Sequence, residues 1–469
     1  MTLGPKLLRR TLSIPTWSIK LARSSSSFST YTMPSGQQPA WLKTLIADQG
    51  PPPNLFAWTP ENLGRGANHN TPAISLTSGR NDLDRRVFIL GVGNIGRLYA
   101  SYLARQPRPP PITLVVHRKE LLTQWVQGGG VELTCGSVVI KNKDFDIEWW
   151  TRTAPDHGPV REVADGKKLR NLFISTKASA AMTEADRLRG YLDRHSTVVF
   201  AQNGMSKLWP PHGQAYIAHR YEAGNAPSFL ACIVNHGVLS TGPFKSIHTA
   251  PADASIGPVL VNPQPPPSVD FFMAQVAAAP LLNSKSVSAG DLWLLQLEKL
   301  VMNAIINPLT ALLRCKNGEL FAGGELNNPL GQVLNKLLAE TSAVIHALVN
   351  HESSADILAS YMHQNQPSKS DIPTENVHEL RKGLAERFSL PCLKKKLYRF
   401  GVQVGENRSS MLQDVEAGKP TEIRDFNGWL VDMAAFLGQR LDVSTHRTLI
   451  ELVEGNVILN QAELVRRLL

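Results

Sequence analysis

The 469-residue sequence lacks any apolar run that could cross a membrane, which takes about 18 consecutive residues. A membrane-spanning helix is therefore excluded. Cysteine is also scarce, and the spacings of 97, 83 and 77 residues between successive cysteines include no CxxC pair. A disulfide framework or a zinc site needs denser spacing, so we expect free thiols, no metal site and a reducing compartment. The four cysteines are Cys135, Cys232, Cys315 and Cys392.

Acidic residues are absent from the first 47 positions, which carry six basic side chains. Because the whole chain carries +10, the remainder has only +4, too little to indicate a nucleic-acid surface. The basic, serine-rich residues 1–45 are typical of a mitochondrial targeting segment, so we expect a mitochondrial protein. The alternative is a plain N-terminal tail on a cytoplasmic protein, with Met33 as a second start. Residues 46–84, rich in Pro, Gly and Asn, predict an irregular linker.

Short apolar runs alternate with helical spacing over residues 85–286. Runs of four or five such residues are too short for a helix and are typical of buried parallel strands. Strands that alternate with helices predict a doubly wound α/β sheet. We expect strands at 86–90, 112–116, 172–175 and 197–200, and helices at 95–105 and 183–192. Segments 229–234 and 244–248 are expected to close that sheet, and the hydrophilic stretches 142–170 and 208–227 to be surface insertions.

From residue 287 onward the strand pattern ends and helical spacing dominates. The polar stretch 351–375 is expected to be a loop or an insertion. The second half therefore predicts a helical domain without an obvious linker before it. The predicted helices cover 293–313, 334–349, 377–388, 428–436 and 451–468.

A glycine motif directly follows the first predicted strand and opens the next helix. It consists of Gly91, Val92, Gly93, Asn94, Ile95 and Gly96. The first glycine permits a tight turn, the second lets a pyrophosphate approach the backbone, and the third lets helix and strand pack closely. Glycines also form plain turns, but the strand–turn–helix setting indicates dinucleotide binding. The predicted fold is an α/β Rossmann-type dinucleotide-binding domain over 85–286, followed by an all-α C-terminal domain over 287–469.

The end of the second predicted strand indicates which dinucleotide is bound. An NAD site usually has Asp or Glu there, which binds the ribose 2′-hydroxyl. This sequence instead has His117, Arg118 and Lys119. A guanidinium can bind a 2′-phosphate through two hydrogen bonds, so NADPH/NADP is the expected cofactor and Arg118 its phosphate ligand. The alternative is that these residues only end a strand at the surface.

A lysine and two asparagines interrupt the apolar helix predicted over 293–313. Lys299, Asn303 and Asn307 are four residues apart and therefore share one helical face. This face either meets solvent or a domain junction, or it lines a cleft, because burial without partners is costly. A lysine in a partly desolvated cleft has a lowered pKa and can act as a general acid. Pro308 predicts a bend or break beside Asn307.

A third polar cluster comprises residues 409–414 and 421–423, and alone it is typical of helix caps and turns. With the glycine motif and segments 202–205, 299–311 and 317–320, it closely resembles the ketopantoate reductases (2-dehydropantoate 2-reductases). The order and internal spacing of these motifs match over about residues 85–460. The N-terminal extension of about 84 residues departs from compact members of that family.

The resemblance implies an NADP-dependent oxidoreductase that reduces 2-dehydropantoate (ketopantoate) to pantoate, in pantothenate and coenzyme A biosynthesis. It implies that Lys299 is the general acid and that Glu422, near the nicotinamide ribose, orients it and balances its charge. Val238 is larger than the residue usual at its position. The residues implied to bind cofactor are Gly91, Val92, Gly93, Asn94, Ile95, Gly96, Arg118, Lys177, Asn203, Val238 and Glu422. The residues implied to bind substrate are Asn203, Lys299, Asn303, Asn307, Asn317 and Ser410.

Two alternatives to a ketopantoate reductase remain at this point. The same lysine, asparagine, serine and glutamate residues can serve another 2-oxo acid. The fold can also serve a mitochondrial binding or regulatory protein, for instance an RNA-associated one. The mild charge beyond residue 47 and the absence of basic–aromatic RNA-binding motifs disfavour this second alternative.

Overall fold

The computed structural model describes residues 38–64, 82–323, 328–365, 374–438 and 440–469. Most of the expected targeting segment, residues 1–37, lies outside these ranges. The strands are β1 (Phe56–Trp58), β2 (Val87–Leu90), β3 (Ile112–Val116), β4 (Val131–Cys135), β5 (Val138–Asn142), β6 (Asp146–Thr151), β7 (Asn171–Ile174), β8 (Thr197–Phe200), β9 (Ser228–Val234), β10 (Gly237–Gly242), β11 (Lys245–Ala250), β12 (Ala254–Leu260) and β13 (Ser284–Ser286).

The main sheet has the strand order β1-β6-β3-β2-β7-β8-β9-β12-β13. The six strands from β6 to β9 are parallel to one another, whereas β1 and β12 run antiparallel to their neighbours β6 and β9. The chain leaves β2 for β3 on one side and returns to β7 on the other, so a topological switch point lies beside the end of β2. Ligands of doubly wound sheets bind at such a point, which confirms the predicted fold class.

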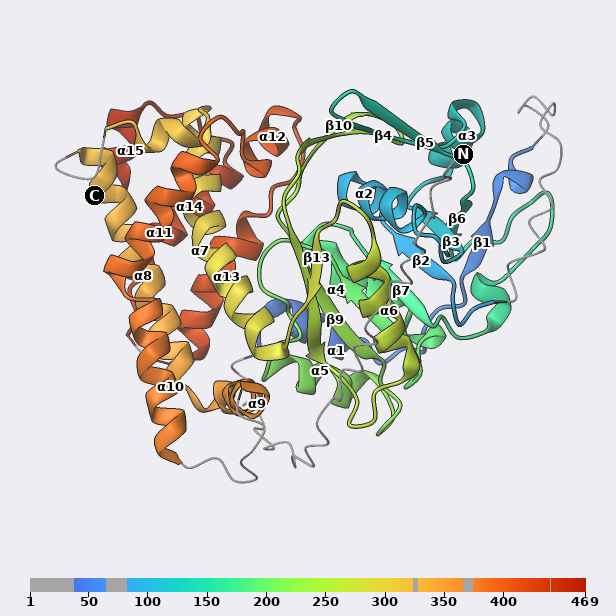
Figure 1. The fold of residues 1–469 in the computed structure, drawn as a ribbon, viewed down its shortest axis with the longest axis horizontal. Coiled ribbons are helices and arrows are strands. Elements are labelled where there is room, and N and C mark those ends of the chain that lie inside the picture. Colours follow the sequence, from blue (N-terminus) through green and yellow to red (C-terminus); the bar gives the residue numbers. More distant parts are fainter. Residues whose placement is uncertain (1–37, 65–81, 324–327, 366–373, 439) are drawn as a thin grey trace, which may run out of the picture.

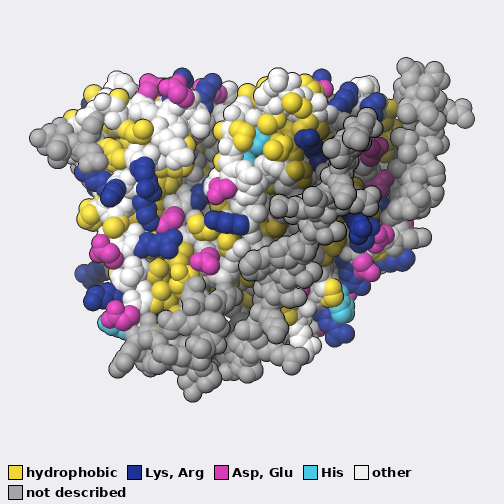
Figure 2. All heavy atoms as spheres, viewed as in Figure 1, with side chains coloured by type: hydrophobic (Ala, Val, Ile, Leu, Met, Phe, Trp, Pro, Cys, Tyr) yellow, Lys and Arg dark blue, Asp and Glu magenta, His cyan; other side chains and the backbone are white. Residues whose placement is uncertain are grey.

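A second, smaller sheet has the order β10-β11-β4-β5 and packs on α2. Figure 1 shows it beside α2, outside the main sheet. The expectation that segment 244–248 closes the main sheet is therefore wrong, because β11 pairs with β4 and β10 instead. In Figure 2, apolar side chains gather where Figure 1 places β10.

The helices are α1 (Ala40–Ala47), α2 (Asn94–Leu103), α3 (Lys119–Gly128), α4 (Ala178–Arg187), α5 (His212–Arg220), α6 (Pro267–Ala278), α7 (Ala289–Leu313), α8 (Pro329–Asn350), α9 (Ala355–Asn365), α10 (Thr374–Arg387), α11 (Leu390–Gln403), α12 (Ser410–Glu416), α13 (Ile423–Phe436), α14 (Ser444–Glu454) and α15 (Gln461–Leu468). Short 3₁₀ turns occur at Pro60–Asn62, Val163–Gly166, Arg189–Tyr191, Asn317–Phe321 and Glu352–Ser354. No helix of the described residues has the length and apolarity that a bilayer crossing requires.

Helix α7 joins the two halves of the molecule (Figure 1). It packs against β9 and β12 on one side and against α8, α12, α13 and α14 on the other. One hydrophobic core therefore continues from the sheet into the helical domain, and it includes Val198, Phe229, Leu297 and Leu300. The helix runs through Pro308 without interruption, so the expected break is wrong. It ends at Arg314, whose backbone is left-handed with φ of 51°.

Six other expectations about local structure need correction. The linker 46–84 contributes β1, which pairs with β6, so the supposed insertion 142–170 is partly a strand of the main sheet. The stretch 208–227 contains α5, and 351–375 contains α9. The helix predicted over 451–468 is two helices, because residues 455–460 separate α14 from α15 and Asn456 has φ of 48°. The predicted helix 183–192 starts earlier, as α4, and ends as a 3₁₀ turn.

Candidate active site

The glycine motif forms the turn between β2 and α2. Gly91 has φ of 97°, a conformation that disfavours other residues, and a Cβ on Gly96 would lie 2.1 Å from the Gly91 carbonyl oxygen. A Cβ on Gly93 would meet nothing within 4 Å, so the space in front of the α2 N-terminus is open. No side chain of the described residues caps this N-terminus. Free N–H groups that face open space fit the pyrophosphate of a dinucleotide.

The other residues implied to bind cofactor lie on several elements, and they differ in their contacts. Asn94 donates a hydrogen bond from Nδ2 to the carbonyl oxygen of Val238 at 3.0 Å, which brings β10 to the glycine turn. Arg118 is exposed at the end of β3, where it precedes α3. Lys177 follows β7 and forms an ion pair with Asp414 of α12, so it bridges the two domains. No sequence pattern predicts Asp414 as its partner.

Lys299 lies in the middle of α7 and points to the α/β domain. Its ammonium donates a hydrogen bond to the carbonyl oxygen of Val234, at the end of β9. Burial lowers the pKa of Lys299 to about 8, and the negative charges of Glu422 and Asp253 oppose this shift. An ammonium with this pKa is charged at neutral pH but releases its proton more readily than an exposed lysine.

Glu422 precedes α13 and is 6% exposed. Burial raises its pKa, while the charge of Lys177 and a hydrogen bond from Asn203 oppose the rise. The Asn203 amide donates to Glu422 Oε2 at 3.3 Å. Gly204, with φ of 86°, lets this loop approach α13, since a Cβ there would lie 2.9 Å from the Asp425 carbonyl oxygen. The expected grouping of lysine, glutamate and asparagine at the domain junction is thus present.

The remaining substrate candidates lie further along α7 and beside it. Asn303 is half-buried one turn after Lys299. Asn307 is buried, and its Nδ2 lies 3.5 Å from the exposed Ser410 hydroxyl, to which it donates. Asn317 donates to the Val404 carbonyl oxygen at 3.3 Å, while its own Oδ1 is buried with no hydrogen-bond partner among the described residues. These polar groups extend the site along one face of α7, as the four-residue spacing predicts.

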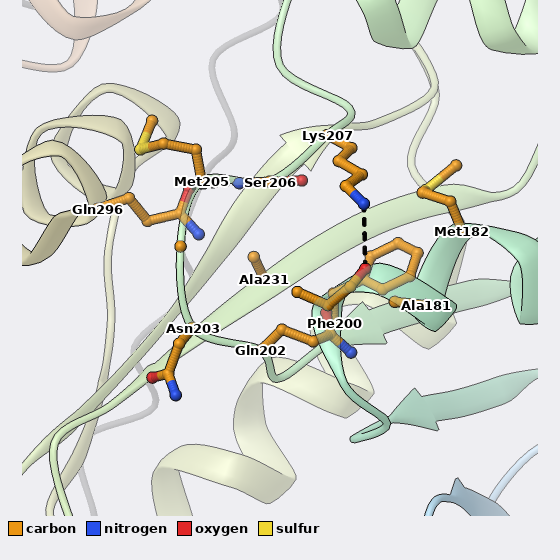
Figure 3. Close-up of a pocket in the computed structure, with 12 residues that line it drawn as sticks. Ala181, Met182, Phe200, Gln202, Asn203, Met205, Ser206, Lys207, Ala231 and Gln296 are labelled. Atoms are coloured by element: carbon orange, nitrogen blue, oxygen red, sulfur yellow. Dashed lines mark hydrogen bonds between the residues drawn. The ribbon is translucent and has the colours of Figure 1, made fainter. Parts of the chain in front are cut away.

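A small pocket of about 30 Å³ lies at the end of β8 and beside the middle of β9, between α4 and α7 (Figure 3). Asn203 is the only predicted site residue among its lining residues. Lys207 reaches across it to the Ala178 carbonyl oxygen at 3.2 Å and also pairs with Asp425 of α13. Gln296 of α7 closes the opposite side and accepts hydrogen bonds from the Trp209 indole and the Ser206 backbone.

The sequence analysis did not predict Gln296, Lys207 or Asp425 as site residues. Gln296 is one turn before Lys299 on α7, so an extended search of the same polar face would have found it. Lys207 and Asp425 are far apart in sequence, and nothing in their local pattern links them. No group of three or more potential metal ligands occurs among the described residues.

The open glycine turn and the half-buried ammonium together define a dinucleotide-dependent oxidoreductase. Two family models match the chain: "Ketopantoate reductase PanE/ApbA" over residues 87–260 and "Ketopantoate reductase PanE/ApbA C terminal" over residues 291–456. The chain therefore belongs to the ketopantoate reductase family, as the motif resemblance predicted.

The chain is similar in sequence to three curated relatives, which are named for two different substrates. The chain is 55% identical to ketoisovalerate reductase BEA2 of Gibberella fujikuroi, with 93% of this chain and all of the relative covered. It is 53% identical to a ketoisovalerate reductase of Beauveria bassiana, with the same coverage of each chain. It is 32% identical to the 2-dehydropantoate 2-reductase of Salmonella typhi, with 79% of this chain and 94% of the relative covered.

Solved structures share the fold at low sequence identity. A PanE/ApbA family ketopantoate reductase from Ralstonia eutropha matches with a TM-score of 0.53 and 18% identity, covering 79% of this chain and 98% of its own. A D-mandelate dehydrogenase solved with NADH matches with a TM-score of 0.52 and 14% identity, at the same coverage. Both comparisons support the two-domain fold.

Proposed function

We propose that the protein reduces a branched 2-oxo acid to the 2-hydroxy acid with NADPH, and that ketoisovalerate is its main substrate. The observation that carries the reductase proposal is the Lys299 ammonium, which donates to the Val234 carbonyl and is stabilised by the charge of Glu422 where the two domains meet. The choice of substrate is supported by relatives of 55% and 53% identity that are named ketoisovalerate reductases.

Ketopantoate is the second candidate, with a role in pantothenate and coenzyme A biosynthesis. It has the carbon skeleton of ketoisovalerate with an added hydroxymethyl group at C3. One observation favours it: the buried Asn317 Oδ1 has no partner among the described residues and can accept a hydrogen bond from that hydroxyl. The motif resemblance and the relative from Salmonella typhi also support it.

NADPH is proposed over NADH because of the residues at the end of β3. An NAD site would place a carboxylate there, but His117, Arg118 and Lys119 are all basic or neutral and exposed. The Arg118 guanidinium is exposed and can bind a 2′-phosphate through two hydrogen bonds.

The proposed chemistry assigns a proton to Lys299. When bound, the reduced nicotinamide supplies the hydride that adds to C2 of the oxo acid. Negative charge then develops on the C2 oxygen, and Lys299 stabilises it and donates a proton to form the hydroxyl. Glu422 keeps the ammonium charged before this transfer, and Asn203 holds the Glu422 carboxylate in place. Solvent then reprotonates the amine.

Substrate positioning falls to the polar groups that follow on α7. The Ser410 hydroxyl and the Asn307 amide lie together, so both can hydrogen-bond one carboxylate. Asn303 lies between them and Lys299 on the same face. A carboxylate held by Ser410 and Asn307 restricts the orientation of the oxo acid relative to Lys299.

The test is an NADPH oxidation assay of the purified protein with ketoisovalerate, ketopantoate and unbranched 2-oxobutyrate. We expect kcat/KM to be highest with ketoisovalerate, and NADH to be a poorer cofactor. A higher kcat/KM with ketopantoate would instead support the second candidate. In that case Asn317→Leu should reduce ketopantoate turnover more than ketoisovalerate turnover, because only ketopantoate has the hydroxyl. Absence of NADPH oxidation with every 2-oxo acid would contradict both.

A mitochondrial location is also proposed, on the composition of residues 1–45 alone. Fusion of this segment to a fluorescent reporter tests it. We expect the reporter to overlap a mitochondrial dye, and a diffuse cytosolic signal would contradict the proposal.

A further inference from the structure

Two buried histidines and a tyrosine form a hydrogen-bonded chain beside the segment that holds Lys299. Tyr102 of α2 lies 2.7 Å from His248 Nδ1, and His248 Nε2 lies 3.0 Å from His236 Nδ1. His236 Nε2 lies 3.0 Å from the Leu282 carbonyl oxygen. The side chains of Tyr102, His248 and His236 come from α2, from β11 and from the turn between β9 and β10, and all three are buried.

The backbone fixes the direction of every hydrogen bond in this chain. The Ala252 N–H donates to His236 Nδ1 at 3.0 Å, so this nitrogen is an acceptor. His236 therefore carries its proton on Nε2 and donates it to Leu282, while His248 donates from Nε2 to His236. His248 Nδ1 must then accept from the Tyr102 hydroxyl. Both rings are neutral in this arrangement, and burial lowers the pKa of His248 to about 4 and also lowers that of His236.

His236 is the middle residue of segment 234–238, and the carbonyl oxygen at each end of this segment accepts a hydrogen bond from a site residue. The Val234 carbonyl oxygen accepts the hydrogen bond from Lys299. The Val238 carbonyl oxygen accepts the hydrogen bond from Asn94 in the glycine turn. Segment 234–238 thus connects the lysine of one domain with the dinucleotide turn of the other. Its position sets the distance between them.

Helix α2 holds the β10–β11 hairpin along its whole length. Asn94 binds near its start, and Tyr102 binds His248 near its end. Between them, the buried Arg97 donates to the carbonyl oxygens of Gly242 and Lys245 at 2.7 and 2.9 Å. The β10–β11 hairpin is therefore fixed to the helix that follows the glycine turn, and the histidine chain is its connection to segment 234–238.

We propose that His236 and His248 are positioning residues that set the Val234 carbonyl against Lys299 and so tune the proton donor. This inference rests on the proposed role of Lys299. Neither histidine touches the reacting atoms, and each acts through the backbone of segment 234–238. The hydrogen-bonded histidines hold the Val234 carbonyl oxygen in a fixed position. The hydrogen bond from Lys299 to this acceptor stabilises the charged form of the lysine.

The groups that face Lys299 determine how its pKa changes when the hydrogen bonds of Tyr102, His248 and His236 are broken. Glu422, which precedes α13, and Asp253, which precedes β12, contribute negative charge, and His236 contributes a neutral ring. Asp253 is itself tied to this segment, because its Oδ1 accepts from Asn235 at 2.8 Å. If segment 234–238 moves, the ammonium loses the Val234 acceptor and the pKa of Lys299 falls further below about 8.

The test compares His248→Phe with His248→Gln and with the control His446→Phe. Gln restores one acceptor and one donor at about the ring-nitrogen spacing. His446 is also buried and hydrogen-bonded on both sides, but by Thr341 and Asn427 within the helical domain. Two readouts are used: the pH dependence of kcat and of kcat/KM, and the pH dependence of Lys299 acetylation by acetic anhydride, followed by peptide mass spectrometry. The second readout requires no turnover.

We expect His248→Phe to lower kcat about two- to fivefold at pH 8 and to shift the Lys299 midpoint down by about 0.5 to 1 pH unit in both readouts. His248→Gln should recover most of the shift, and His446→Phe should lower the melting temperature without any shift. Should His248→Phe fail to fold, Tyr102→Phe removes only the terminal donor and should give a smaller shift in the same direction. A Lys299 acetylation midpoint equal to wild type in both the His248 and Tyr102 variants would overturn the proposal. Wild-type enzyme inactive on every 2-oxo acid would refute the proposed function, while the acetylation midpoints would still decide this inference.

Discussion

Replacement of Glu422 by glutamine tests the electrostatic tuning of Lys299 directly. Glu422→Gln removes a negative charge but keeps the size of the side chain and its acceptor for the Asn203 amide. Because the Glu422 charge supports the ammonium, its loss lowers the pKa of Lys299 by about one unit from about 8. A fall of this size has a distinct signature in the pH profile, because only protonated Lys299 can donate a proton.

The magnitude follows from the protonated fraction of Lys299. With a pKa of about 8, about nine-tenths is protonated at pH 7 and half at pH 8. With a pKa of about 7, these fractions become about one half and one tenth. The variant should therefore lose about twofold in kcat at pH 7, about fivefold at pH 8 and almost nothing at pH 6.

The assay measures kcat for NADPH oxidation at saturating 2-oxo acid from pH 6 to pH 9. Glu298→Gln is the matched control, because Glu298 adjoins Lys299 in sequence but pairs with Arg387 and Lys396 on another side of α7. Its profile should follow that of wild type. If Glu422→Gln loses activity by the same factor at every pH, the carboxylate does not act through the charge of Lys299 and the reasoning is wrong.

Three further changes have defined outcomes. Lys299→Ala should reduce kcat by about 10²-fold or more while the NADPH dissociation constant, measured by fluorescence titration, stays nearly unchanged. Arg118→Ala should weaken NADPH binding much more than NADH binding in the same titration, and equal losses would contradict the 2′-phosphate role. Gln296→Leu leaves the buried Trp209 indole N–H without its acceptor and should lower the free energy of unfolding by about 1 to 3 kcal/mol, measured by urea denaturation.

The strongest sequence patterns predicted the parts of the fold that depend on local periodicity. The glycine motif and the four-residue spacing on α7 each follow from short-range geometry, and both lie where expected. The three-residue β1 is too short to show any period, and β11 has a pattern equally suited to either sheet. Pairing partners that are distant in the chain decided both cases. The uninterrupted course of α7 through Pro308 likewise depends on tertiary packing.

The site shows the same division. Lys299 and Asn307 could be selected from residue type and spacing, and Glu422 from the family resemblance. The acceptor for Lys299 could not, because it is the backbone carbonyl of Val234, and a carbonyl is present at every residue. His236 and His248 gave no signal either, since a lone histidine in a strand region is unremarkable until the fold aligns it with another.

The acid strength of Lys299 depends on both domains at once. Its helix belongs to the C-terminal domain, whereas its acceptor Val234 belongs to the α/β domain. The ion pairs of Lys177 with Asp414 and of Lys207 with Asp425 cross the same junction, so the closed arrangement is held by charges on both sides of the site. Separation of the domains would return water to the ammonium and raise its pKa toward the ordinary value of 10.5. Proton donation is therefore most favourable when the two halves are packed together.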